Sequence, residues 1–252
     1  MSVWYCIPSA RPPEEAEQVL KLWRERGYKI ALWLDSQSGH EPFVSHEGLY
    51  IVVGGVYPGY AAAVNQLVRH VIATQPDAEW LVTGGDDIEP DANHSAEEIA
   101  LSCGRYFGTL HDVPNFQLST FGVMQPTGDR YGADERHLGE RGSAYIDRVC
   151  GSPWMGREFC RRMYGGRGPL FEGYFHMGED EELQAVAQKL GVLWQRPDLI
   201  HFHRHWARKN KDRSDMLKFL ERANSTEEWQ KYKQIFAERK AAGFPGHEPL
   251  EV

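Results

Sequence analysis

Two groups of acidic residues are the candidates for chemistry in this chain. Asp86 and Asp87 are adjacent and follow Gly84-Gly85, and a second acidic run occupies residues 179–182. Two carboxylates in a compact turn can hold Mg²⁺ or Mn²⁺, hard cations that also accept phosphate oxygens. A Gly-Gly-Asp-Asp stretch is equally typical of a solvated turn. The positions of the surrounding strands and helices are therefore needed to distinguish a metal site from a simple turn.

Three histidines form a second possible metal-binding group. His201, His203 and His205 alternate along the chain, and on a β-strand this spacing places all three imidazoles on one face. We expect His203 to bind metal, with His201 or His205 as replacements. Because imidazole is also a favoured zinc ligand, a zinc hydrolase built on these histidines is a competing prediction. The four cysteines form no C-x-x-C pair, which argues against a thiolate zinc site and favours buried, reduced thiols.

The elements that must position these groups follow an alternating pattern. Strands are predicted at 3–7, 28–34, 50–53 and 80–83, and helices are predicted to begin at Pro12, Tyr60 and His94. Further strands are expected within 116–124, 192–194 and 199–205, and an amphipathic helix at 178–190. This pattern predicts an α/β fold with a mainly parallel sheet flanked by helices. Ligands of such sheets bind beyond the carboxyl ends of the strands, where Ser9, Asp35, Asp86 and Asp87 stand.

Composition narrows the class of protein. The 252 residues, of which 41% are hydrophobic, can bury one sizeable core, and we expect one domain at 1–208 and a helical extension at 209–252. No stretch approaches the ~20 apolar residues of a membrane span and no signal peptide is recognised, so a cytoplasmic protein is expected. The net charge of -8 disfavours a surface that coats nucleic acid, although a basic run at 204–213 leaves a local basic face open.

The order of these motifs resembles the GT-A glycosyltransferases, in particular the inverting family 2 type. Pro8-Ser9, Asp35 and Asp86-Asp87 match the family's positions after strands one, two and four, with Gly85 in place of the first acid of the usual D-x-D triplet. The resemblance implies a Rossmann-like GT-A domain that binds a nucleotide sugar and Mn²⁺ or Mg²⁺. Nucleotide-sugar contacts are implied for Pro8, Ser9, Arg11, Asp35, Asn65 and Asp86, and metal ligation for Asp87 and His203.

The second acidic run resembles the family's "ED-x-x-L" helix. Glu179-Asp180 is followed by Leu183, and Leu190-Gly191 stands at the family's spacing. The resemblance makes Asp180 the general base, and inverting transfer requires one to remove the proton of the acceptor hydroxyl. Repulsion from the neighbouring glutamates is expected to raise the pKa of Asp180. Trp154 and Arg157 fall where family members place the floor of the acceptor site.

The predicted function is therefore a metal-dependent, inverting hexosyl or pentosyl transfer from a nucleotide-diphosphate donor, with a UDP-sugar favoured. The loop composition is also similar to that of phage enzymes that glycosylate hydroxymethylated pyrimidines in DNA. This similarity implies modified DNA as an acceptor and the host cytoplasm as the location. A histidine-site hydrolase and a non-catalytic nucleotide-sugar binder remain alternatives.

Overall fold

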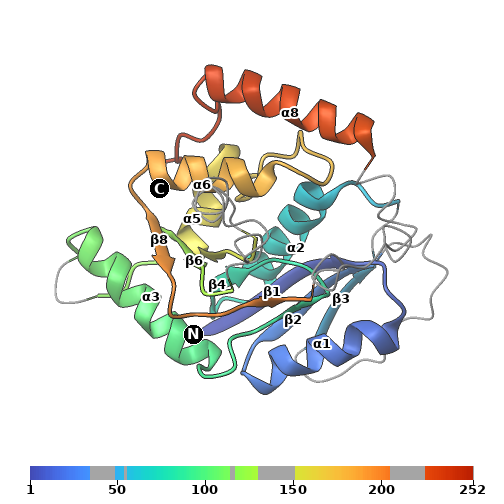
Figure 1. Cartoon of the computed structure of the whole chain (residues 1–252). Helices are drawn as coiled ribbons and strands as arrows, with labels where there is room; N and C mark the ends of the chain where they lie inside the picture. Colours follow the sequence, from blue (N-terminus) through green and yellow to red (C-terminus); the bar gives the residue numbers. More distant parts are fainter. Residues whose placement is uncertain (35–48, 54–55, 114–116, 130–150, 205–224, 252) are drawn as a thin grey trace.

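The computed structural model describes all residues except 35–48, 54–55, 114–116, 130–150, 205–224 and 252. Its centre is a seven-stranded sheet in the order β3-β2-β1-β4-β7-β6-β8 (Figure 1). The strands are β1 (Ser2–Ser9), β2 (Lys29–Leu34), β3 (Leu49–Val53), β4 (Ala78–Val82), β6 (Val123–Pro126), β7 (Trp154–Gly156) and β8 (Leu193–Arg196). Only β7 pairs antiparallel to its neighbours among these strands, so the predicted mainly parallel α/β sheet is confirmed.

Helices cover both faces of the sheet because its strands are apolar on both sides. One hydrophobic cluster packs α2 (Tyr60–Thr74), α5 (Arg157–Arg162) and α6 (Glu179–Lys189) on one face, and a second packs α1 (Pro13–Glu25) and α3 (Ala96–Leu110) on the other (Figure 1). Inside β1, Trp4 belongs to the first cluster and Tyr5 to the second, as the alternation of a strand requires. The central strands therefore contribute side chains to both clusters, one on each face of the sheet.

Local signals predicted several elements with their ends. The helix predicted from Tyr60 begins there, and α3 starts at a capping box in which Ser95 Oγ accepts from Glu98 N while the Glu98 carboxylate accepts from Ser95 N. The predicted strand 116–124 begins only at Val123. The strand β7 was not predicted, and its Gly156 is required because a Cβ there would lie 1.9 Å from Thr120 O.

A separate two-stranded sheet pairs β5 (Ile88–Glu89) with β9 (Phe202–His203) antiparallel. It lies directly after the acidic turn and brings residues far apart in the sequence into register, with His203 opposite Ile88. The strand predicted over 199–205 is thus confined to two residues within the described part of the chain. This short ladder positions the histidine that the sequence analysis selected.

The C-terminal helix α8 (Thr226–Ala241) lies outside α6 (Figure 1). None of its residues is fully buried, and Phe236 is partly buried against the first hydrophobic cluster. A 3₁₀ turn at Met163–Gly166 leads from α5 toward α6. No helix among the described residues is long and apolar enough to cross a membrane. Cys6, Cys103 and Cys160 are buried free thiols, as expected, while Cys150 lies outside the described residues.

Candidate active site at the ends of β1 and β4

The sheet has a topological switch point at β1. The chain proceeds from β1 to β2 and β3 on one side, whereas β4 pairs with the other edge of β1. Open α/β sheets bind ligands in the crevice outside the carboxyl ends of their strands at such a point. The segments that leave β1 and β4 here carry Ser9, Arg11, Asp86 and Asp87. The predicted nucleotide-binding residues on these two segments therefore meet at the edge where a ligand is expected.

Asp86 is held by side chains that follow β1. Ser9 Oγ donates to Asp86 Oδ2 over 2.7 Å, and Arg11 Nε donates to Asp86 Oδ1 over 2.7 Å. Burial raises the pKa of Asp86, although the Arg11 guanidinium and the Ser9 hydrogen bond favour its charged form. Arg11 Nη2 also donates to Asp87 Oδ2 over 3.2 Å. One guanidinium thus bridges both carboxylates of the acidic turn.

Asp87 turns its other oxygen toward His203. His203 Nε2 lies 3.3 Å from Asp87 Oδ1, and Arg204 N donates to Asp87 O over 2.7 Å. Asp129, which the sequence analysis passed over, accepts from His203 N through Oδ2 over 3.1 Å. In the sequence, Asp129 is one polar residue of a loop, and nothing distinguishes it there from the other loop residues. Asp87 and His203, 116 positions apart, form one polar site.

Asp87 and His203 could contribute two ligands to a divalent cation. Two ligands at about 2.1 Å in adjacent octahedral positions are about 3 Å apart, close to the observed separation of Oδ1 and Nε2. Among the described residues, no group of three or more His, Cys, Asp or Glu side chains forms a larger cluster. Two protein ligands suit Mg²⁺ or Mn²⁺, which commonly take their remaining ligands from water and substrate phosphates. They do not suit a structural zinc site, which needs four.

Buried Tyr5 and half-buried Tyr60 both bond the backbone of the glycines that precede Asp86. Tyr5 Oη donates to Gly85 O over 2.7 Å, and Tyr60 Oη donates to Gly84 O over 2.8 Å. Burial and the charges of Asp87 and Asp86 raise the pKa of Tyr5. Burial and the charges of Glu179 and Asp180 likewise raise the pKa of Tyr60. Both hydroxyls therefore bond the glycines that precede Asp86, and Tyr60 also lies within electrostatic reach of Glu179 and Asp180.

The amino-terminal turn of α6 concentrates negative charge. Gly178 precedes the helix in the left-handed region with φ +98°, and a Cβ there would lie 2.5 Å from Tyr232 Cδ2. Burial and the charge of Asp180 raise the pKa of Glu179, whose Oε2 has no hydrogen-bond partner among the described residues. Burial and the charge of Glu181 raise the pKa of Asp180. A partly buried carboxylate with a raised pKa is a stronger base than an exposed one.

Three residues expected at the site have structural positions instead. Asn65 is fully buried, and its amide bonds Leu170 N, Leu170 O and Glu172, so it offers a nucleotide sugar no accessible atom. Trp154 is also fully buried, in the core between β4 and β6. Arg157 donates to the carbonyls of Ile72, Gln75 and Ala78 at the end of α2 and the start of β4. The expected acceptor contacts of Trp154 and Arg157 are corrected accordingly, since burial and backbone carbonyls occupy these side chains.

The predicted histidines do not lie together, and some of the other predicted residues lie outside the described part of the chain. His201 is buried, its Nδ1 lies 3.0 Å from Ser152 Oγ, and its ring packs edge-on against Trp23. It therefore does not share a face with His203, contrary to the alternation argument, because the strand spans only two residues. Pro8 is part of β1 and partly exposed. His205 and Asp35 lie outside the described residues.

Comparisons with known proteins add little to this geometry. No family profile and no curated protein matches the chain. Among solved structures, the chain is similar to a mutant of Drosophila β-1,4-galactosyltransferase 7 in complex with manganese, UDP-Gal and xylobiose. The two share 12% identity and a TM-score of 0.44 over 89% of this chain and 80% of that chain. At this level of similarity no residue's role is transferred from that protein.

Proposed function

We propose that this protein is a metal-dependent, inverting glycosyltransferase that moves a sugar from a nucleotide diphosphate to an acceptor hydroxyl. One observation carries the proposal. At the switch point of the sheet, Asp87 and His203 present adjacent oxygen and nitrogen ligands beside the Arg11 guanidinium. The carboxylates of α6 raise the pKa of Tyr60, whose hydroxyl donates to Gly84 O directly before this acidic turn. This reaction needs ligands for a metal ion, a positively charged side chain that binds the diphosphate, and a base.

The donor is proposed to bind along the ends of β1 and β4. Arg11 carries a delocalised charge and donates several hydrogen bonds, which suits it to phosphate oxygens. In the absence of a donor it is bound by Asp86 and Asp87. Ser9 and Pro8 stand beside it at the end of β1, and Asp35 is proposed to meet the base. We favour a UDP-sugar, and the sugar itself is left to the donor screen below.

Asp87 and His203 would hold a Mn²⁺ or Mg²⁺ ion, with Asp86 facing the ribose or a bound water. The ion would supply positive charge that stabilises the leaving diphosphate. Arg11 would contribute to the same stabilisation from the protein side, because it can transfer hydrogen bonds from the acidic turn to the phosphates. The carboxylate charge of the turn is thereby balanced in both the free and the donor-bound protein.

Asp180 is proposed to act as the general base. The acceptor oxygen forms its bond to the anomeric carbon, the bond from that carbon to the diphosphate oxygen breaks, and the hydroxyl proton passes to Asp180. Attack from the face opposite the diphosphate inverts the anomeric centre. The raised pKa of Asp180 favours this proton transfer, since a base is most effective when its pKa approaches the working pH.

For the acceptor, we retain a hydroxymethylated pyrimidine in DNA as the first candidate to test, with the protein acting in a phage-infected host cytoplasm. The composition of the basic run at 204–213 supports this candidate, because Lys and Arg side chains bind DNA phosphates, and of this run only Arg204 is among the described residues. Arg204 itself is exposed and paired with Glu89. Transfer assays with polysaccharide, protein and DNA acceptors distinguish these hydroxyls from one another.

The proposal is tested with a donor screen. Thermal unfolding is measured with UDP-, GDP- and CMP-sugars, each with Mn²⁺ and with a chelator, because a ligand that binds the folded state raises the unfolding temperature. We expect a Mn²⁺-dependent increase for one nucleotide class, followed by sugar transfer in an acceptor panel that includes hydroxymethylcytosine DNA. Donor binding without transfer or donor hydrolysis would instead indicate a non-catalytic binder. Metal-dependent ester hydrolysis without donor binding would indicate a hydrolase.

A further inference from the structure

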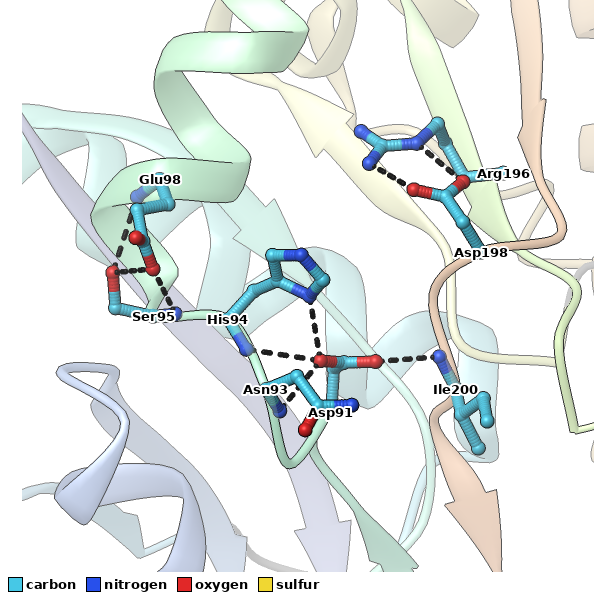
Figure 2. Close-up of polar contacts among 8 residues, drawn as sticks. All are labelled: Asp91, Asn93, His94, Ser95, Glu98, Arg196, Asp198 and Ile200. Atoms are coloured by element: carbon cyan, nitrogen blue, oxygen red, sulfur yellow. Dashed lines mark hydrogen bonds and ion pairs between the residues drawn. The ribbon is translucent and has the colours of Figure 1, made fainter.

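Asp91 is a buried carboxylate that belongs to neither acidic group. It follows β5 closely, is 1% exposed, and lies between two segments distant in the sequence (Figure 2). Oδ1 accepts from Asn93 N over 2.9 Å and from His94 N over 3.0 Å, and His94 Nδ1 lies 2.8 Å from the same oxygen. Oδ2 accepts from Ile200 N over 2.8 Å. Each oxygen thus serves a different segment of the chain.

The bonding of Asp91 requires an ionised carboxylate. Burial opposes ionisation, but the hydrogen bonds from Ile200 N and His94 outweigh it and lower the pKa of Asp91. Both oxygens face backbone N–H donors, so both must accept. An asparagine would place its NH₂ group against one of these donors in either orientation of the amide. The site is therefore specific for aspartate at this position.

The segment that Asp91 holds is the one that delivers His203. Ile200 precedes β9, whose His203 stands opposite Ile88 in β5, next to Asp87. Asp91 follows β5, the strand that pairs with β9. Its bond to Ile200 therefore joins the two chain segments at the end of the ladder away from Asp87. We propose that Asp91 is a positioning residue that sets the separation of His203 Nε2 from Asp87 and thereby the affinity of this pair for a divalent cation. This inference rests on the cation site of the proposed function.

Two variants of Asp91 separate its local bonds from its link to Ile200. Asp91→Asn keeps the shape of the side chain but opposes one N–H donor with another. Asp91→Ser keeps a short acceptor for the turn at Asn93 and His94, as serine does in such turns, and is too short to reach Ile200. The matched control is Asp198→Asn. It neutralises an exposed carboxylate in the segment before Ile200, whose ion pair among the described residues is with Arg196 (Figure 2).

The first measurement needs no metal. Amide hydrogen exchange of the full chain is compared at Ile200 and His203 in the wild type and the three variants. We expect exchange at both amides to be about 10-fold faster in Asp91→Asn and Asp91→Ser and unchanged in Asp198→Asn, because a lost hydrogen bond lowers the free energy of local opening. Unchanged exchange in both Asp91 variants would overturn the inference. Global unfolding in urea, measured in parallel, shows whether each variant is folded.

The second measurement is Mn²⁺ binding by electron paramagnetic resonance. Residues that orient a metal ligand typically change metal affinity by about 10–100-fold when replaced, and we expect a loss of this size in both Asp91 variants and none in the control. Wild-type affinity in an Asp91 variant with fast exchange at Ile200 would overturn the inference while leaving the proposed function intact. Absence of Mn²⁺ binding by the wild type would overturn both.

Discussion

Arg239 of α8 binds the buried carboxylate of Glu182 in α6 through two hydrogen bonds, Nε to Oε2 over 2.7 Å and Nη2 to Oε1 over 2.6 Å. The same carboxylate accepts from Tyr164 Oη over 2.7 Å and from Tyr174 Oη over 2.9 Å. Glu182 stands less than one helical turn after Asp180. The C-terminal helix is therefore joined to the helix that carries the proposed base by an ion pair whose carboxylate is buried.

Removal of Arg239 is expected to destabilise the whole fold. Arg239→Met leaves Glu182, whose side chain is 1% exposed, without its counter-charge, and we expect a loss of about 3–5 kcal/mol in the free energy of unfolding in urea. Arg161→Met is the control, because the pair of Arg161 with Glu158 is exposed and should contribute about 1 kcal/mol or less. An equally small loss of unfolding free energy in both variants would show that the contact of α8 with Glu182 does not stabilise the fold.

Replacement of the proposed base should separate binding from turnover. Asp180→Asn is expected to lower the transfer rate by about 100–10,000-fold while the donor still raises the unfolding temperature with Mn²⁺, because only proton removal is lost. Steady-state rates and thermal unfolding check this prediction. Glu158→Gln is the control, since Glu158 lies on α5 and its carboxylate pairs with the exposed side chain of Arg161. Retained turnover in Asp180→Asn would exclude the assigned role.

Arg11 is expected to affect the cation and the donor in opposite directions. Arg11→Met removes a positive charge from between Asp86 and Asp87, so Mn²⁺ should bind more tightly in the absence of nucleotide. The donor should bind about 10-fold more weakly or worse, because a charged hydrogen-bond donor to its phosphates is lost. Titrations of Mn²⁺ and donor check both effects, with Arg24→Met on α1 as the control. Weaker Mn²⁺ binding would mean that Arg11 organises the carboxylates for the metal.

The stability of the protein should fall in mild acid because of His201. Burial lowers the pKa of His201 to about 3, whereas in the unfolded chain it is about 6.5. Between these values the unfolded state binds a proton that the folded state does not, so stability is lost as pH falls through this window, by at most ~1.4 kcal/mol per pH unit. Urea unfolding across this range should show a shallower slope for His201→Gln than for the wild type. His70→Gln, at an exposed site on α2, is the matched control, and identical slopes for wild type and His201→Gln would refute the assignment.

Local signals in the sequence are sufficient to predict the α/β architecture and the position of the acidic turn. The helix at Tyr60–Thr74 and the acidic start of α6 follow from local periodicity and from charges in the first helical turn, which need no distant partner to be recognised. The carboxyl ends of β1 and β4 could be placed side by side because parallel strands with crossover helices leave their polar residues at one edge.

Which of the candidate side chains face that edge depends on long-range packing. Trp154 and Arg157 lie in and beside β7, a strand of three residues whose place in the sheet depends on contacts with β4 and β6. His201 and His203 carry the same local signal, yet the first packs on Trp23 and the second meets Asp87. The reason is physical: the burial and pairing of these residues depend on partners that are distant in the sequence, and a spacing of two residues contains no information about those partners.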